Sequence, residues 1–306
     1  MPIVESDNIS KKFGKIEALQ QVSFSIEKGE LFGLIGPDGA GKSTLFNILV
    51  TLLNPDSGTA RIMGYDLIKQ YKEIRKIIGY LPGQFSLYKD LSCIENLEFF
   101  ATLYGENIEK NYSLIRPIWE QLLPFKDRPA AKLSGGMKQK LSLCCALIHR
   151  PSILILDEPT TGVDPVSRQE FWEILQMLKK ENITVLVSTS YMDEASLCNR
   201  IALIQKGTIL NINTPTQILS EFKGQLFAIQ SKEIYRLLLL FQEIEWIDNY
   251  YASGQQVNIV LNEKNNIEKL PLLLQEKNIS FSHIQAIKPN TEDCFIQLMR
   301  SQQENI

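Results

Sequence analysis

A glycine-rich stretch near the N-terminus carries residue types that can hold a chain of phosphates. It fits the pattern G-x-x-x-x-G-K-[ST] and reads Gly36, Pro37, Asp38, Gly39, Ala40, Gly41, Lys42, Ser43 and Thr44. In such a loop, glycines let successive backbone N–H groups point inward, and the helix that follows adds the positive end of its dipole. Lys42 can then reach the β- and γ-phosphates, and Ser43 offers a hydroxyl to Mg²⁺. The pattern predicts a nucleoside triphosphate site, the alternative being a glycine-rich turn that fits by chance.

Two carboxylates, Asp157 and Glu158, follow an aliphatic run at residues 153–156. Such a run is typical of a parallel strand buried on both faces, and ligands of open α/β sheets bind at the carboxyl ends of strands. There Asp157 can orient Mg²⁺ and its waters, and Glu158 can accept a hydrogen bond from an attacking water. Two acidic residues after a strand are more often the solvated start of a loop. The buried run beside a phosphate loop favours the catalytic interpretation.

A second potential anion site lies further along, at Leu133, Ser134, Gly135, Gly136 and Met137. Ser134 is placed to cap the helix that follows, and an exposed helix N-terminus with two glycines can face an anion. An ordinary capped helix is the competing interpretation. Upstream, Phe13 precedes a glycine and can stack on an adenine ring. It is equally well explained as a core aromatic at a strand end.

The elements that must position these residues alternate between strand-like and helix-like patterns. Strands are predicted at residues 31–35, 153–156 and 184–188, and helices at 44–53 and 166–181. This alternation indicates an α/β fold, preceded by an antiparallel β lead-in. A helical pattern from about residue 90 to 123 interrupts it, and we interpret residues 90–145 as an inserted helical subdomain.

We place a domain boundary near Gly224, so that residues 1–223 form the first domain. Residues 224–306 follow the order βαββαβα, which predicts a small α+β accessory domain. It carries no catalytic constellation, so a structural extension or a dimer contact is its favoured role.

Composition bounds the class of protein. The chain has 306 residues, of which 44% are hydrophobic and 22% charged, as is ordinary for a globular protein. Its 32 basic and 35 acidic residues give a net charge of -3, so nucleic acid is not an expected partner. The five cysteines lack metal-ligand spacing and are interpreted as reduced thiols of a cytosolic protein. The longest apolar run is far short of the ~20 residues that span a bilayer, and the N-terminus lacks a secretory signal pattern.

Together these motifs resemble those of the nucleotide-binding subunits of ABC transporters, over about residues 1–223. The phosphate loop, the signature at 133–136, the Walker B strand at 153–158 and the D-loop at 162–165, which contains Asp164, occur in that family's order. Kinases and small GTPases lack the signature. The resemblance implies a P-loop ABC ATPase fold that binds ATP and Mg²⁺, with the metal held by Ser43 and Asp157.

The resemblance also implies partners. In a head-to-tail dimer, the signature residues from Leu133 to Met137 of one subunit would cover the ATP bound by a second ATP-binding subunit. A separate membrane-spanning subunit would hold this dimer at the cytoplasmic face of the membrane. Residues 85–91, 191–195 and 288–296 resemble the branch that energises multidrug and related exporters.

The chain departs from the family pattern at two positions. The loop that enters the helical subdomain usually carries a glutamine, but Gly83 occupies the aligned position and Gln84 follows it. Gln84 is therefore the candidate Mg²⁺ ligand from this loop. Ser190 stands where the family has a histidine, and we expect its hydroxyl to act in catalysis by a hydrogen bond to the γ-phosphate or the attacking water.

The expected function is ATP hydrolysis that powers export. A soluble ABC ATPase acting on ribosomes or DNA would carry tandem cassettes or a long coiled-coil insertion, and neither is found in this sequence. A regulatory ATP binder with weakened hydrolysis draws support from Ser190 and Gly83, whereas the intact carboxylate pair argues against it. The transported compound is expected to be selected by the membrane partner.

Overall fold

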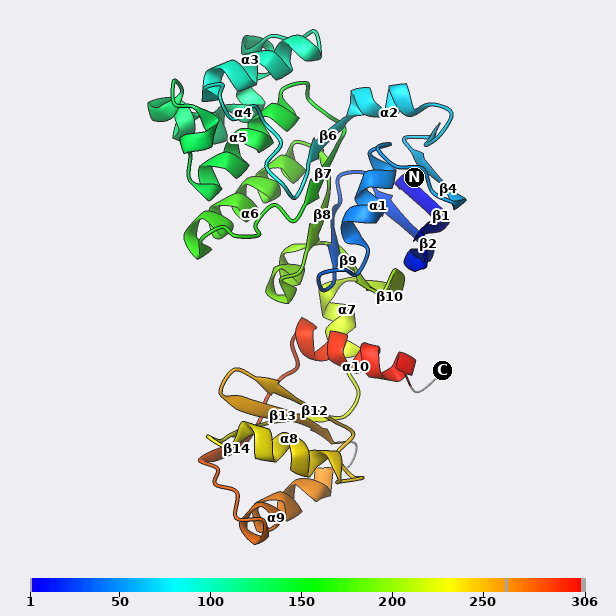
Figure 1. Ribbon diagram of the computed structural model, residues 1–306, viewed down its shortest axis with the longest axis vertical. Helices are drawn as coiled ribbons and strands as arrows, with labels where there is room; N and C mark the ends of the chain where they lie inside the picture. The colour runs from blue at the N-terminus through cyan, green and yellow to red at the C-terminus, as the bar shows by residue number, and fades with distance from the viewer. Residues whose placement is uncertain (1, 262–263, 304–306) are drawn as a thin grey trace. The chain divides into compact units, whose positions relative to one another are not determined.

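The computed structural model describes residues 2–261 and 264–303, and the chain divides into two compact units, Met1–Pro215 and Thr216–Ile306. The expected boundary near Gly224 lies inside the second unit, just before its first strand. Each unit contains its own β-structure and hydrophobic core (Figure 1).

A six-stranded sheet with the order β10-β9-β3-β8-β7-β6 forms the centre of the first unit. Its strands are β3 (Leu31–Ile35), β6 (Ile78–Leu81), β7 (Ile153–Asp157), β8 (Thr184–Thr189), β9 (Arg200–Gln205) and β10 (Thr208–Asn213). All pairs are parallel except β9 with β10. Every residue of β3, β7 and β8 is buried, which confirms the interpretation of their aliphatic runs.

Helices cover this sheet on both sides. The helix α1 (Lys42–Leu49) packs on β7, and α6 (Pro165–Lys180) packs on β3 and β8. Figure 1 shows α1 on one side of these strands and α6 on the other. Because β9, β3, β8, β7 and β6 run in one direction, their carboxyl ends meet at one edge, where the loops that follow them come together.

A second, antiparallel sheet with the order β2-β1-β4-β5 precedes and flanks the first. It contains β1 (Pro2–Phe13), β2 (Ile16–Glu27), β4 (Ser57–Ile62) and β5 (Tyr65–Asp66), and α2 (Tyr71–Ile77) follows it. Alternate residues of β2 from Val22 to Ile26 are buried, as expected for a sheet with one face on the core. The predicted antiparallel lead-in is therefore confirmed.

The inserted helical region contains α3 (Cys93–Leu103), α4 (Ile108–Leu122) and α5 (Gly135–Leu147). The helical pattern expected from about residue 90 to 123 forms two helices, because α3 ends at Leu103 and α4 begins at Ile108. Gly105 there has φ 69°, and Asn107 caps α4 by accepting a hydrogen bond from the Lys110 N–H at 2.8 Å. Short 3₁₀ turns occupy Leu123–Phe125, Ala130–Lys132 and Met192–Leu197.

The loop that enters this helical region is tied to α3 by a buried amide. Asn96 accepts a hydrogen bond from the Tyr88 N–H at 3.0 Å and donates to the carbonyl oxygens of Tyr88 and Leu91. Ser92 and Glu95 form a reciprocal capping box at the start of the same helix. These contacts fix the path of residues 88–92 on the surface.

The second unit follows the order βαββαβα, which confirms the predicted sequence of elements. It contains β11 (Gln225–Gln230), α8 (Ile234–Gln242), β12 (Asn249–Ser253), β13 (Gln256–Leu261), α9 (Leu270–Glu276), β14 (His283–Ala286) and α10 (Thr291–Gln303). The strands form an antiparallel sheet in the order β12-β13-β11-β14. A 3₁₀ turn, Lys264–Lys269, leads into α9, and α7 (Pro215–Ser220) begins where the first unit ends.

Asp293 links α10 to the sheet of the second unit. Its buried carboxylate accepts hydrogen bonds from the Tyr251 hydroxyl, from the Asn258 amide at 3.5 Å and from the Asn290 N–H at 2.7 Å. Asn290 in turn accepts from the Asp293 N–H at 3.0 Å, so the two residues cap α10 reciprocally. Burial and the bond to Asp293 raise the pKa of Tyr251.

We expect Asp293→Ala to destabilise the second unit by about 3 kcal/mol, because it leaves the buried Tyr251 and Asn258 groups without their acceptor. Native-state hydrogen exchange of β11 and β13 peptides measures the effect. Glu292→Ala, at the exposed neighbouring position, is the control and should change exchange little. Equal amide protection of β11 and β13 in the two variants would contradict the stabilising role of Asp293.

Candidate functional site

The loop after β3 has a backbone conformation and close contacts that favour glycine at its key positions. Gly39 and Gly41 have φ of 76° and 105°, in the left-handed region. A Cβ at Gly41 would collide with the carbonyl oxygen of Ala18, and one at Gly36 with that of Ile204. Gly41 and Gly36 are thus required by close packing against β2 and β9, whereas Gly39 has open space around it and is favoured by its backbone conformation alone.

A cavity of about 420 Å³ opens beside this loop at the carboxyl edge of the sheet. It is lined by Ile16, Glu17, Ala18, Asp38, Gly39, Ala40, Gly41, Lys42, Ser43, Thr44, Gly83, Gln84, Asp157, Glu158 and Thr161. The structure therefore brings the phosphate loop, the carboxylate pair and Gln84 together around one space. Gly36 and Pro37 precede the lining residues of the loop, and their carbonyl oxygens accept hydrogen bonds from the Lys42 ammonium.

Lys42 is the most constrained charge of the site. Its side chain is 3% exposed, and its Nζ donates to the carbonyl oxygens of Gly36 at 2.7 Å and Pro37 at 3.0 Å. The same Nζ lies 2.9 Å from Oε1 of Glu158. A buried ammonium needs this set of acceptors, since a buried charge without a partner is strongly unfavourable.

Glu158 is held in an uncommon backbone conformation. Its φ of 47° is left-handed, which costs a residue with a Cβ about 1–2 kcal/mol. Its N–H donates to the Ser188 Oγ at 2.9 Å, and its Oε2 accepts from the Thr161 hydroxyl at 3.1 Å. These contacts direct the carboxylate toward Lys42 and the cavity.

Asp157 lies buried at the end of β7, where its Oδ1 accepts a hydrogen bond from the Ser188 hydroxyl at 2.6 Å. Gly83 packs close against it, because a Cβ there would lie 3.3 Å from the Asp157 carbonyl oxygen. Burial, with a contribution from the negative charge of Asp157, raises the pKa of Tyr80 to about 12. Mg²⁺ prefers oxygen ligands from one or two carboxylates together with phosphates and water. The oxygens of Ser43, Asp157 and Gln84 around one cavity fit that requirement.

The signature segment lies outside this cavity. Ser134 caps α5 by accepting from the Met137 N–H at 3.3 Å, which confirms the predicted cap, and Leu133 is buried. Ser134 and Gly135 are exposed. A helix N-terminus displayed at the surface in this way can meet an anion carried by another molecule.

The signature helix packs tightly on the helix that follows the D-loop. A Cβ at Gly136 would lie 2.8 Å from the Ser167 Oγ. Asp164 caps that second helix, α6, by accepting from the Ser167 N–H at 3.0 Å. The N-termini of α5 and α6 are therefore in direct contact.

Phe13 and Ser190 also lie outside the lining of this cavity. Phe13 is 49% exposed at the end of β1, with the Lys11 ammonium 5.7 Å from its ring centre, so its interpretation as a core aromatic is wrong. Ile16, at the start of the next strand β2, lines the cavity. Stacking of adenine on the Phe13 ring stays a prediction. Ser190 is partly buried directly after β8, and its catalytic role also stays a prediction.

Sequence reasoning did not identify Ser188 and Thr161, whose hydroxyls contact the carboxylate pair. The available signal for Ser188 was a polar residue at the end of an otherwise aliphatic strand. Thr161 stands in the loop after β7, where many hydroxyl residues have no role in a site.

Comparison with known proteins places this geometry in a family. The sequence model of the ABC transporter family matches residues 19–161. The chain is 35% identical over 303 residues to the probable multidrug ABC transporter ATP-binding protein YbhF of Escherichia coli K12, covering 97% of this chain but only 52% of that protein. It therefore spans about half the length of that relative.

A second relative matches over nearly its whole length. The linearmycin resistance ATP-binding protein LnrL of Bacillus subtilis 168 is 32% identical over 307 residues, which covers 97% of this chain and 98% of that protein. Among solved structures, a dimeric ATP-binding cassette bound to ADP and phosphate superposes with a TM-score of 0.62 and 27% identity, over 69% of this chain and 98% of that one. The chain belongs to the ATP-binding proteins of the ABC transporter family.

Proposed function

We propose that this chain is an ATP-binding and ATP-hydrolysing subunit that powers export through a separate membrane-spanning partner. The observation that carries the proposal is the meeting of Lys42 and Glu158 at 2.9 Å beside a glycine loop, with Asp157 next to them. The names of relatives, which include multidrug and linearmycin resistance proteins, support export as the direction.

In this proposal each residue has a physical task. The backbone N–H groups of the loop and Lys42 hold the phosphates, and Ser43 and Asp157, together with Gln84, would hold Mg²⁺. Magnesium, when bound with the nucleotide, supplies positive charge that neutralises the phosphate oxygens. Glu158 accepts a hydrogen bond from the attacking water, and Ser190 donates one in place of the family's histidine. If the Ser190 hydroxyl does not donate this hydrogen bond, the alternative function is that of a regulatory ATP binder with weakened hydrolysis.

A head-to-tail dimer follows from the exposed signature. Ser134 and Gly135 lie at the surface and away from the cavity of their own chain, so they are free to cover a nucleotide held by a second ATP-binding subunit. Asp164, at the start of α6, would lie at the same interface. The dimeric cassette with ADP and phosphate supports the formation of a dimer.

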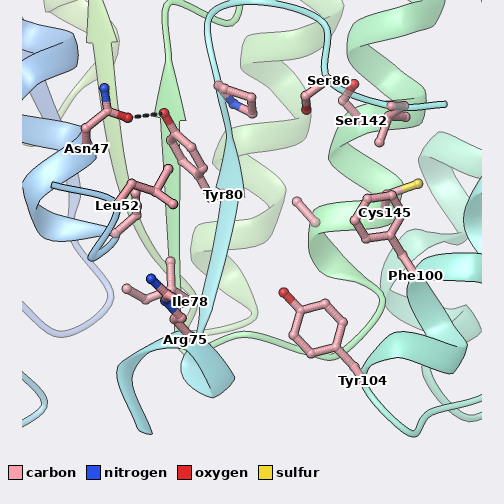
Figure 2. A pocket seen from close by; sticks show the side chains of 14 residues that line it. Asn47, Leu52, Arg75, Ile78, Tyr80, Ser86, Phe100, Tyr104, Ser142 and Cys145 are labelled. Carbon is pink, nitrogen blue, oxygen red and sulfur yellow. Dashed lines mark hydrogen bonds between the residues drawn. The ribbon is translucent and has the colours of Figure 1, made fainter. Parts of the chain in front are cut away.

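An apolar groove is the structural feature that favours a membrane-spanning partner. A cavity of about 510 Å³ lies between the core sheet and the helical region, with Leu52 and Tyr80 on one side and Phe100, Tyr104 and Cys145 on the other (Figure 2). Exposed apolar surface of this kind marks a contact with another protein. In the part of the chain that the structure describes, no helix is long and apolar enough to cross a bilayer. We assign the groove to the membrane-spanning subunit, which would place this chain at the cytoplasmic face.

We expect Lys42→Ala to weaken ATP binding by about 2 kcal/mol, or roughly 30-fold in Kd, because a charge-assisted contact to phosphate is lost. Equilibrium binding of a fluorescent ATP analogue measures this. Lys76→Ala is the matched control, since Lys76 is an exposed lysine paired with Glu73 on α2. Unchanged affinity in Lys42→Ala would refute the phosphate-loop assignment.

Glu158→Gln should keep nucleotide binding but lower kcat at least about 100-fold, since an amide retains the shape and loses the basic carboxylate. Steady-state ATPase rates with the membrane partner present measure the loss. Glu120→Gln, which removes an exposed carboxylate paired with Arg116, should hydrolyse ATP at the parent rate. Turnover at the parent rate in Glu158→Gln would assign the base elsewhere.

Purification of the chain from solubilised membranes tests the transport function directly, because a multi-span protein should be retained with it. Leu52→Glu should abolish retention while nucleotide binding persists, because it places a charge in the apolar groove. Leu272→Glu is the matched control, since Leu272 is 65% exposed against 63% for Leu52 and lies on α9. Retention of the partner by Leu52→Glu, or no partner at all, argues against this function or this surface.

A further inference from the structure

Ser188 is a fully buried hydroxyl residue on the central strand β8. Its parallel register places it beside Asp157 on β7 and Leu34 on β3. The preceding positions 185–187 are aliphatic, so a serine here removes apolar contacts from the core. A buried hydroxyl is unfavourable unless it is hydrogen-bonded, so the partners of the Ser188 hydroxyl determine whether it is tolerated in the core.

Both capacities of this hydroxyl are used, and both serve the carboxylate pair. Its Oγ donates to the Asp157 Oδ1 at 2.6 Å and accepts from the Glu158 N–H at 2.9 Å. The hydroxyl has one proton, and the Asp157 carboxylate can only accept, so the direction of both bonds is fixed. The Glu158 N–H also donates to the Ser188 carbonyl oxygen at 3.2 Å, so Ser188 holds the Glu158 backbone through its hydroxyl and its main chain. The hydroxyl is the one group that contacts both Glu158 and the Asp157 side chain.

The Glu158 backbone needs such support. Its left-handed φ of 47° persists only where surrounding contacts hold it. The direction of the Glu158 carboxylate follows from that backbone, and the presentation of the Asp157 carboxylate follows from its bond to Ser188. Ser188 does not itself line the cavity.

We propose that Ser188 is a positioning residue that sets Mg²⁺ affinity and turnover together, by holding Asp157 and Glu158 through a single hydroxyl. The inference rests on the proposed function, since it assigns Asp157 to the metal and Glu158 to the water. Groups that orient metal ligands typically change metal affinity or activity about 10–100-fold when they are replaced. Ser188 should behave in that way although it touches neither nucleotide nor metal.

The experiment compares Ser188→Ala, Ser188→Thr and the parent full-length chain. The first measurement is the affinity for a fluorescent ADP analogue during a Mg²⁺ titration, and the second is kcat with the membrane partner. In Ser188→Ala the half-saturating Mg²⁺ concentration should rise roughly 10–100-fold and kcat should fall. Affinity in EDTA should stay within about twofold, because the loop and Lys42 hold the phosphates without Ser188. Ser188→Thr retains the hydroxyl and should restore the parent behaviour.

Thr184→Val is the control, because Thr184 is another buried hydroxyl residue of β8. Its Oγ1 accepts from the Gly29 N–H at 2.9 Å, at the opposite end of the strand. It should leave the Mg²⁺ dependence unchanged. An equal rise in Thr184→Val would mean a general weakening of the strand and would overturn the inference. Parent-like Mg²⁺ dependence in Ser188→Ala would do the same.

Two further results keep the test decisive. If Ser188→Ala does not fold, Ser188→Cys keeps the volume with a weaker donor, and it should still raise the Mg²⁺ requirement. A parent-like requirement in that variant counts against Ser188. If the parent chain shows no ATPase activity, the proposed function fails, whereas the Mg²⁺ titration still decides the role of Ser188.

Discussion

The site is organised around one buried positive charge. The Lys42 ammonium is almost closed off from solvent, so its charge must be balanced by oxygens that the fold supplies. Those oxygens come from the glycine loop after β3 and from Glu158 after β7, two strands separated in the sheet by β8. Parallel pairing in register brings the ends of these strands level. The carbonyl oxygen of Gly36 and the carboxylate of Glu158, whose backbone is left-handed, both reach the Lys42 ammonium.

The loop that follows β6 lines two separate cavities. Gly83 and Gln84 line the cavity of the phosphate loop, while the adjoining Pro82 and Ser86 line the apolar groove. Asn96 fixes the continuation of this loop on α3. Only a few peptide units therefore separate the residues that line the two cavities. In the proposed function, this short stretch would connect the nucleotide site to the docking groove for the membrane-spanning subunit.

Sequence patterns predicted the parts whose signals are local. The glycine loop, the aliphatic runs of β7 and β8, the Ser134 cap and the element order of the second unit could be read from spacing alone. The interruption between α3 and α4 was missed because its signals are two single residues, Gly105 and the Asn107 cap, within a longer helical pattern. The Lys42–Glu158 pair and the two bonds of Ser188 depend on register between strands far apart in the chain. No local pattern encodes that register, and for the same reason the left-handed backbone of Glu158 could not be foreseen.

The contact between Gly136 and Ser167 has a mechanical consequence. A methyl group would not fit between the first turns of α5 and α6, so the two helix ends touch without intervening space. Packed protein interiors have low compressibility and transmit strain. A displacement of the exposed first turn of α5 would then be transmitted directly to the first turn of α6. Asp164, which caps that turn, is thereby linked through packing to the exposed residues Ser134 and Gly135.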